Sequence, residues 1–545
     1  MSDNKMPASH RAAAPRSSSY MAQRPYLDRT IGDLARDQAM RRPDAIAFVG
    51  SSETTFEKLL VDAEALLAAL LELGLRAGDV ISFQLPNWTE AAVINLAAAL
   101  GGFVINPIVT IYRDREVSDM LARSGSKILF ACHKYRGYDF AAMIERIHSQ
   151  EPSLDFREFF VRGSQLPSYK MLVDSARGKN PGAKPVDPDS LKMLLFTSGT
   201  TGRAKGVMHS HNTLSRAAQN AIICWSIGEG DGILMPSPVT HISGFSNGLD
   251  LPFIAGTKTV LMEYWNSRDA VSLIDGHQVA GTVAATPFLT ELAAAAAAAQ
   301  SSLPSLRFFA CGGAPVPSPV VRSANAAFGR LCAFRIYGSS EVPFVTLGYF
   351  RDQDAELAAS TDGAVFDYDV LILDDNGEAV APGKEGEIAA RGPSMFIGYS
   401  DEPASERTHT AEGYFLTGDL GKIVSVNGLV ITGRKKDLII RGGENISAAE
   451  IEEIITTYPG VADVAVVAMP HDRLGEGVCA FIVAAADVAV SALTTFIHSK
   501  GLARQKTPEK FYVLDELPRT PSGKVRKDVL RGWAADPNKE KVTLT

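Results

Sequence analysis

A glycine- and hydroxyl-rich segment offers the clearest chemistry in this sequence. Residues 194–209 read LLFTSGTTGRAKGVMH, an apolar run that leads into alternating glycine and threonine and then lysine. Glycines allow tight turns that present backbone N–H groups to an anion, hydroxyls add donors, and lysine adds positive charge. The pattern therefore predicts a phosphate-binding loop, with these candidate residues: Thr197, Ser198, Gly199, Thr200, Thr201, Gly202 and Lys205.

Two better-known nucleotide motifs do not fit this chain. A Walker loop requires Ser or Thr directly after its lysine, whereas Gly206 follows Lys205. The triplet Gly228-Glu229-Gly230 leads into an apolar strand pattern with no third glycine and no helix, so it is not a dinucleotide fingerprint. The loop at 197–206 is therefore a phosphate site of a different kind.

Strands and helices that alternate along the chain must position this loop. Helical patterns at 56–73 and 90–100 alternate with short apolar runs at 79–85 and 127–131, and this alternation favours parallel sheets covered by helices. The same pattern continues with strands at 191–197, 232–235 and 257–261 and helices at 213–223 and 289–300.

The pattern of predicted secondary structure changes after about residue 360. Short strands and an Asn-Gly turn predict a β-rich subdomain over 360–435. From residue 451 the pattern is helix, strand, strand, helix, strand, which predicts a small α+β unit. The basic segment 434–437 suits a hinge, so we expect an N-terminal domain over 26–435, a mobile C-terminal domain over 436–545, and an irregular tail over 1–25.

Composition narrows the class of protein. The 545 residues are 46% hydrophobic and 21% charged, with a net charge of −8, which argues against nucleic acid as the partner. Five scattered cysteines predict neither a disulfide framework nor a zinc site. The apolar stretch 91–112 is interrupted by Asn, Gly-Gly and Pro, so we expect a buried helix and strand rather than a membrane span. Residues 1–24 have the composition of a transit peptide but fit a cytoplasmic terminus better.

Five motifs then identify a family. The phosphate loop and four further segments occur in the order typical of the adenylate-forming superfamily of acyl-CoA synthetases, adenylation domains and luciferases, and the resemblance spans residues of about 30–530. Those four segments are YGSSE (337–341), YFLTGD (414–419), ITGRKKDLIIRGGENI (431–446) and PRTPSGK (518–524). The resemblance implies an α/β N-terminal domain and a small mobile C-terminal domain.

The resemblance also implies how ATP binds. The phosphate loop would hold the β- and γ-phosphates, and Tyr337 would stack on adenine, for which an aromatic face is suited. Asp419 would accept both ribose hydroxyls, because a carboxylate offers two acceptor oxygens. The remaining implied contacts are a glycine turn against adenine, the YGSSE turn and a basic side chain before the hinge: Gly312, Gly313, Ala314, Pro315, Gly338, Ser339, Ser340 and Arg434.

Other residues take catalytic roles by the same resemblance. Glu341, helped by the Thr197 hydroxyl, would bind Mg²⁺. Lys524 would neutralise charge that builds on the α-phosphate, and His241 would gate entry of the carboxylate. The resemblance further implies an acyl pocket bordered by His241, Phe245 and Val342, a hinge at Lys436, and passage of coenzyme A past Gly442 and Gly443.

The implied activity is a two-step ligase that uses ATP, Mg²⁺ and coenzyme A. A carboxylic acid becomes an acyl-adenylate and is then transferred to the thiol. The uncharged segment Ile242–Ser246 disfavours an amino acid, and residues 106–117 resemble ligases of medium-chain or alicyclic acids. The sequence leaves open an aromatic acid, a carrier-protein acceptor, a luciferase-like oxygenase, and assembly as a homodimer. A nucleotide-binding regulator without catalysis is disfavoured, because the implied site residues are all present: Glu341, Asp419, Arg434 and Lys524.

Overall fold

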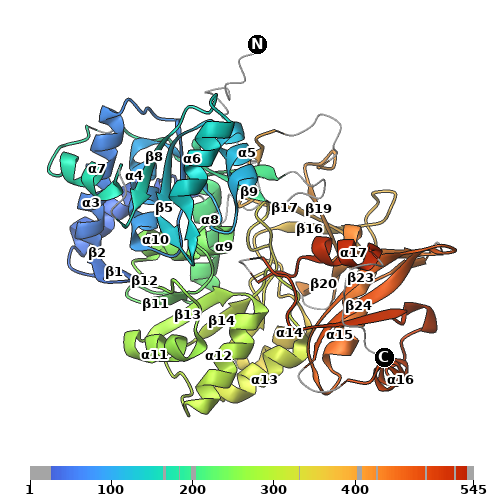
Figure 1. Ribbon diagram of the computed structural model, residues 1–545. Helices are drawn as coiled ribbons and strands as arrows, with labels where there is room; N and C mark the ends of the chain where they lie inside the picture. The colour runs from blue at the N-terminus through green and yellow to red at the C-terminus, as the bar shows by residue number, and fades with distance from the viewer. Residues whose placement is uncertain are drawn as a thin grey trace.

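The computed structural model describes residues 26–163, 167–182, 184–197, 204–330, 332–401, 408–424, 427–442, 444–484, 488–520 and 523–536. The predicted tail over 1–25 lies outside these ranges. In Figure 1 the blue-to-green N-terminal elements form one body, the orange-to-red C-terminal elements lie to its right, and the third sheet described below lies between them. The α/β fold class predicted from the sequence is confirmed.

One seven-stranded sheet carries both ends of the phosphate loop. Its order is β18-β10-β9-β4-β3-β5-β8, and the run from β9 to β8 is parallel whereas β10 is antiparallel to both its neighbours. The strands are β3 (Val80–Gln84), β4 (Val104–Pro107), β5 (Ser126–Cys132), β8 (Arg157–Val161), β9 (Leu191–Thr197), β10 (Lys205–Ser210) and β18 (Gly398–Tyr399).

The second seven-stranded sheet has the order β15-β14-β13-β11-β12-β1-β2 and is parallel except for the β1–β2 pair. Because parallel strands end at the same edge, the segments after β14 and β15 emerge side by side. The strands are β1 (Ile46–Val49), β2 (Glu53–Thr55), β11 (Gly232–Met235), β12 (Lys258–Leu261), β13 (Val279–Ala284), β14 (Phe308–Cys311) and β15 (Ala333–Arg335).

Helices cover these two sheets, and local sequence sets where they begin. Ser210 caps α8 by accepting from the backbone N–H of Thr213. The main helices are α2 (Ile31–Arg41), α3 (Phe56–Glu72), α4 (Thr89–Gly101), α5 (Asp114–Ser124), α6 (Phe140–Gln150), α7 (Tyr169–Ala176), α8 (His211–Cys224), α11 (Ser267–His277), α12 (Thr286–Ala298) and α13 (Ser318–Phe328). Short helical pieces are α9 (Ile242–Gly244), the π-helical turn η1 (Phe245–Asp250), α10 (Leu251–Ala255) and α14 (Ala355–Ser360).

Among the described residues, two sheets of four and five strands and a two-stranded pair, β6 (Lys134–Tyr135) with β7 (Tyr138–Asp139), complete the fold. The third sheet is antiparallel and confirms the β-rich segment: β16 (Asp369–Leu373), β17 (Gly386–Arg391), β19 (Phe415–Ile423) and β20 (Leu429–Arg434). The C-terminal sheet has the order β22-β21-β24-β23 with β25 beside β24: β21 (Ile439–Arg441), β22 (Glu444–Ile446), β23 (Val461–His471), β24 (Gly475–Ala484) and β25 (Lys510–Leu514). Its helices are α15 (Ala448–Thr456), α16 (Val490–Ser499) and α17 (Lys527–Ala535).

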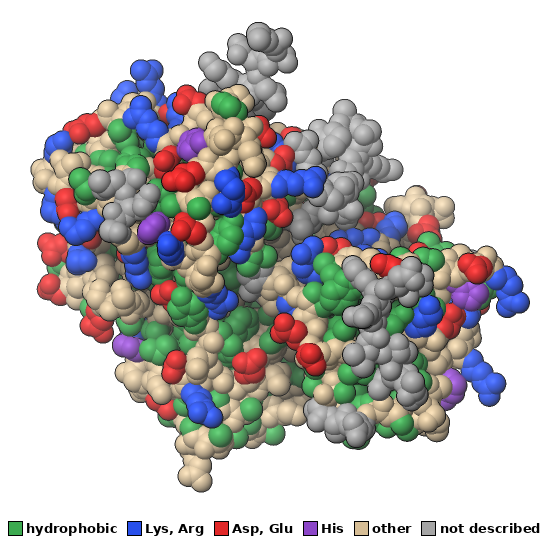
Figure 2. Space-filling view, viewed as in Figure 1, with side chains coloured by type: hydrophobic (Ala, Val, Ile, Leu, Met, Phe, Trp, Pro, Cys, Tyr) green, Lys and Arg blue, Asp and Glu red, His purple; other side chains and the backbone are tan. Residues whose placement is uncertain are grey.

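The long apolar stretch at 91–112 forms the buried helix α4 and the buried strand β4, as predicted. Among the described residues no helix combines the length and apolarity needed to cross a membrane. Acidic and basic side chains are intermixed over the face shown in Figure 2, in keeping with the modest net charge. None of the five cysteines, all of which lie within the described ranges, forms a disulfide. The domain boundary at residue 436 stays a prediction.

Candidate active site

The two ends of the predicted phosphate loop lie together. Lys205, at the start of β10, is paired in register with Thr197 at the end of β9, so these two residues lie side by side. The Lys205 ammonium lies 5.1 Å from the ring centre of Tyr399 on β18. Ser198, Gly199, Thr200, Thr201 and Gly202 fall outside the described residues, so their predicted phosphate contacts stay predictions.

The turn at 337–341 holds Glu341 in a defined direction. The Ser339 hydroxyl donates to Oε2 of Glu341 over 2.9 Å, and the Tyr399 hydroxyl donates to Oε1 over 2.9 Å. Each carboxylate oxygen has two lone pairs, so both can still accept from, or bind, a further group. The Glu341 side chain is therefore held in one orientation, and its carboxylate can still bind a metal ion or accept a further hydrogen bond.

The oxygen atoms of the two predicted metal ligands, Glu341 and Thr197, fit Mg²⁺. This ion prefers a few carboxylate or hydroxyl oxygens together with phosphate and water. Glu341 and Thr197 would supply one carboxylate and one hydroxyl. Within the described ranges no group of three or more His, Cys, Asp and Glu side chains gathers as a metal site. One carboxylate and one hydroxyl would leave the other positions of an octahedral ion to phosphate oxygens and water.

His209, for which the sequence suggested no role, lies directly beneath this turn. Its Nε2 donates to the Ser340 carbonyl oxygen over 2.7 Å, and its Nδ1 lies 3.0 Å from the Thr213 hydroxyl. Burial lowers the pKa of His209 to about 4, so the ring is neutral at neutral pH. A lone histidine in a strand carries no sequence signal of this kind.

The candidate ribose site is built on the third sheet. Asp419 on β19 is paired in register with Arg434 on β20, and the Arg434 Nε donates to Oδ1 of Asp419 over 2.8 Å. The Tyr337 hydroxyl donates to Oδ2 over 2.7 Å. Asp419 is 4% exposed. The sequence assigned Tyr337 only a stacking face, and its bond to Asp419 is a further finding.

The glycine turn at 312–315 lies between β14 and the candidate ribose site. A Cβ built on Gly312 would come within 2.6 Å of the Ile336 carbonyl oxygen, so only glycine fits against the chain leading to Tyr337. Gly313 has a φ of +78° and faces Lys524, whose Cε would be 3.9 Å from a Cβ at that position. The turn and Lys524 are thus neighbours.

Lys524 comes from the C-terminal domain but lies among N-terminal residues. A Cβ on the preceding Gly523 would lie 3.4 Å from Ala285. Burial and, to a smaller extent, the neighbouring Arg434 lower the pKa of Lys524 to about 8, although Asp419 and Glu341 act in the opposite direction. The structure therefore brings Lys524 together with the metal and ribose candidates.

His241 lies near Lys524. It precedes α9, and its Nδ1 lies 3.1 Å from the Ser243 hydroxyl. Burial lowers the pKa of His241 to about 3, and the charge of Lys524 contributes. A neutral imidazole cannot hold a carboxylate by ionic attraction, so its predicted gating role would be steric.

The two other predicted acyl-pocket residues are fully buried. Val342 follows the 337–341 turn, and Phe245 begins the π-helical turn η1. Beneath η1 the Lys192 ammonium forms a buried ion pair with Asp250 over 2.6 Å and lies 4.5 Å from the Phe245 ring centre. This ion pair anchors the segment that carries Phe245.

The hinge candidate Lys436 lies in the short 3₁₀ turn Lys435–Asp437. Arg531 on α17 donates to the Lys436 carbonyl oxygen over 3.5 Å and forms an ion pair with Asp437. Gly442, with a φ of +61°, turns the chain between β21 and β22, and its N–H donates to the Leu474 carbonyl in the same domain. Gly443 lies outside the described residues.

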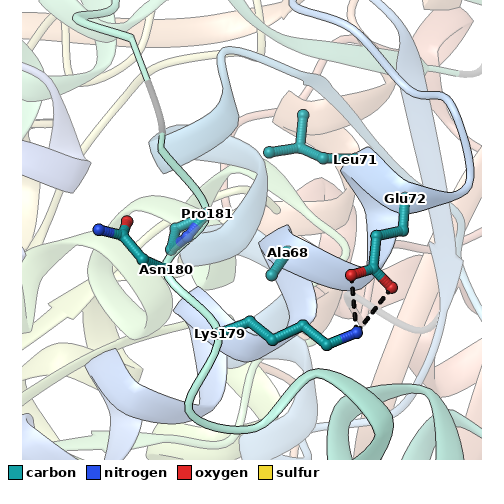
Figure 3. Close-up of a pocket in the computed structure, with 6 residues that line it drawn as sticks. All are labelled: Ala68, Leu71, Glu72, Lys179, Asn180 and Pro181. Carbon is teal, nitrogen blue, oxygen red and sulfur yellow. Dashed lines mark hydrogen bonds and ion pairs between the residues drawn. The ribbon is translucent and has the colours of Figure 1, made fainter.

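Two surface cavities lie away from these residues. One, of about 280 Å³, lies against α3, and there Lys179 forms an ion pair with both carboxylate oxygens of Glu72 over 2.7 and 2.9 Å. Figure 3 shows the residues that line it. A neighbouring cavity of about 710 Å³ is lined by Arg36 and Glu64 among others. None of the predicted site residues lines either cavity.

Comparison with known proteins identifies the arrangement. Residues 35–400, more than half of the chain, match the family profile described as AMP-binding enzyme, and residues 450–524 match its C-terminal domain. The chain belongs to the AMP-binding enzyme family. It is accordingly an ATP-dependent, adenylate-forming ligase, and the resemblance found in its motifs is confirmed.

Relatives of this AMP-binding enzyme act on different acids. It is 33% identical to the medium-chain fatty-acid–CoA ligase of Escherichia coli, over 95% of this chain and 92% of the relative. It is 30% identical to the vibriobactin-specific 2,3-dihydroxybenzoate-AMP ligase of Vibrio cholerae, over 93% and 94%. The ATP-bound structure of MatB from Rhodopseudomonas palustris matches with a TM-score of 0.81 at 26% identity, over 93% of this chain and all of that one.

Proposed function

We propose that this enzyme is an AMP-forming carboxylate–CoA ligase. In the first step the carboxylate of the acid attacks the α-phosphorus of ATP, a new P–O bond forms, and pyrophosphate leaves. In the second step the thiol of coenzyme A attacks the acyl carbon, its proton is lost, and AMP leaves. The observation that carries the proposal is the position of Lys524, which reaches Gly313 from the C-terminal domain.

Each side chain around Lys524 has a role in adenylation. The Lys524 ammonium neutralises charge that develops between the carboxylate and the α-phosphate, and Ser340 donates to that phosphate. Asp419 accepts from the ribose hydroxyls, and its neighbours Tyr337 and Arg434 hold it in place. Glu341 and Thr197 would hold Mg²⁺, which supplies charge neutralisation for the phosphates. The protein contributes mainly position and charge.

The second step needs a different arrangement. We infer that rotation about Lys436 withdraws Lys524 and brings the turn at Gly442 and Gly443 to the acyl-adenylate, where small residues leave room for the pantetheine arm. The ion pair of Arg531 with Asp437 lies at this hinge. One active site would then serve both half-reactions in turn.

We infer a medium-chain or alicyclic acid as the substrate. Ile242, Ser243, Gly244, Phe245 and Ser246 carry no charge that could pair with a substrate ammonium. Asp250, which follows in η1, is engaged by Lys192. The similarity to a medium-chain ligase supports this choice, whereas the similarity to a dihydroxybenzoate-AMP ligase supports an aromatic acid and a carrier-protein thiol as the alternative.

A panel of carboxylic acids tests the proposal. Pyrophosphate and AMP release would be measured for acetate, octanoate, cyclohexanecarboxylate, benzoate and 2,3-dihydroxybenzoate, each with coenzyme A, with a phosphopantetheinylated carrier protein, or with neither. We expect acid-dependent pyrophosphate release that is greatest for octanoate or cyclohexanecarboxylate, and AMP release that coenzyme A accelerates. Acceleration by the carrier alone would establish the alternative, and no acid-dependent release would refute both.

A further inference from the structure

Beyond the residues that the family motifs contain, the protein has a buried histidine that is bonded to the backbone of the candidate metal site. We propose that His209 is a positioning residue, which fixes the peptide between Ser340 and Glu341 and links it to the strand that leaves the phosphate loop. This inference rests on the proposed function, because it takes Glu341 to be a ligand of the nucleotide-bound Mg²⁺.

The hydrogen bonds of His209 define the orientation of its ring. The Ser340 carbonyl oxygen can only accept, so the proton must be on Nε2, and Nδ1 presents a lone pair to the Thr213 hydroxyl. That hydroxyl in turn accepts from the backbone N–H of Ser210 over 3.1 Å. His209 is completely buried. Both ring nitrogens are therefore engaged, and the ring has one orientation.

The peptide that His209 holds is also held from its other edge. The carbonyl of Ser340 and the N–H of Glu341 belong to the same planar unit. His209 donates to that carbonyl, and the N–H donates to the Ser339 hydroxyl over 3.2 Å. Because this plane is held at both edges, the position of the Glu341 Cα atom is fixed. The Ser339 and Tyr399 hydroxyls then orient the carboxylate from that anchored position.

The bond also connects the candidate metal ligand to the phosphate loop. Lys205 and His209 lie on the same face of β10, because side chains alternate along a strand. Lys205 lies over the ring of Tyr399, and the Tyr399 hydroxyl donates to Glu341. Strands β10 and β18 are paired through Val207 and Tyr399. Glu341 is thus held from β18 through its carboxylate and from β10 through its backbone.

The test separates binding of the metal complex from binding of the nucleotide. Calorimetry would measure the affinity for α,β-methylene-ATP with Mg²⁺ and with EDTA. For His209→Leu we expect about a tenfold weaker affinity for the Mg²⁺ complex, equivalent to about 1.4 kcal/mol, and a change below about twofold in EDTA. His209→Gln, whose amide can donate to Ser340, should return the Mg²⁺ affinity to within about threefold of that of the unmodified protein.

A matched substitution controls for general destabilisation. His211 is also buried, and its Nδ1 accepts from the Ile31 backbone N–H over 3.4 Å, away from the turn. His211→Leu should lower the melting temperature without altering the Mg²⁺-dependent part of the affinity. If His209→Leu does not fold, Thr213→Val, which frees the ring from its second partner, should cause a smaller loss of about threefold that is again confined to the Mg²⁺ complex.

Several outcomes would overturn the inference. The first two are an equal loss of affinity in Mg²⁺ and in EDTA for His209→Leu, and no loss of affinity in either. The other two are a failure of His209→Gln to restore the affinity, and the same Mg²⁺-specific loss in His211→Leu. The failure of the proposed function is distinguishable, because it would show as an absence of acid-dependent ATP–pyrophosphate exchange in the unmodified protein. The binding measurements need no turnover.

Discussion

The lowered pKa of Lys524 predicts an alkaline limit to adenylation. The ammonium form is the one that can neutralise charge on the α-phosphate, and its pKa is about 8 rather than 10.5. At pH 9 a group with a pKa of 8 is charged in about 9% of molecules, whereas an ordinary lysine is charged in about 97%. We therefore expect kcat/KM for MgATP to fall about tenfold between pH 7 and pH 9.

ATP–pyrophosphate exchange measures this step without coenzyme A, and kcat/KM reports the pKa of the free enzyme. The imidazole of His241 does not titrate in this interval, because its pKa is about 3. Lys524→Arg keeps a positive charge throughout and should abolish the alkaline fall. Lys524→Ala should lower exchange by about 10² to 10³ at pH 7 while the thioester is still formed from supplied acyl-adenylate.

Three results would refute this reasoning about Lys524. A rate that stays constant from pH 7 to pH 10 would mean that the side chain is not desolvated as the structure indicates. An unchanged alkaline fall in Lys524→Arg would assign the titration to another group. Equal loss of both half-reactions in Lys524→Ala would remove its specific role in adenylation.

Three further substitutions test other parts of the structure. Asp250→Ala leaves the Lys192 ammonium buried without its charged partner and should lower the free energy of unfolding by about 3 to 5 kcal/mol; a loss below about 1 kcal/mol in urea denaturation would contradict the importance of this pair. Tyr337→Phe removes one hydrogen bond to Asp419 and should weaken ATP binding about fivefold, as measured by calorimetry, and unchanged affinity would show that the hydroxyl does not support ribose binding. Lys436→Ala should slow thioester formation from supplied acyl-adenylate about tenfold with exchange within about twofold, and equal slowing of both steps would argue against a hinge at this position.

Regular elements were predictable where local sequence alone determines them. The strand predictions at 191–197 and 232–235 coincide with β9 and β11. The helix predicted at 289–300 instead begins at Thr286, because Pro287 is well suited to the first turn of a helix. The helix predicted at 213–223 begins at His211, because Ser210 supplies the cap. Boundaries thus depended on capping chemistry rather than on apolar periodicity.

The parts of the site that sequence could not predict are contacts between distant segments. His209 and Ser340 are 131 positions apart, and Tyr337 and Asp419 are 82 apart. The two residues of each pair lie in different segments of the sequence. Nothing in either segment indicates that it contacts the other. Motif spacing pointed to Lys524, but only the folded arrangement puts it beside Gly313. Resemblance to a family thus predicts which residues belong to the site. The side chains and backbone groups that hold these residues in place are known only from the folded structure.

The contacts of helix α17 have a consequence for engineering this enzyme. Arg531 on this helix is joined to Asp437, and Lys527 is joined to Glu452 on α15 over 2.7 Å. A chimaera in which the crossover falls after Asp437 would pair a foreign Arg531 equivalent with the resident aspartate. It would also take the segment bearing Lys524 and the turn at 435–437 from different parents. A crossover before Lys435 keeps both ion pairs from a single parent, so transplants of the C-terminal part should begin there.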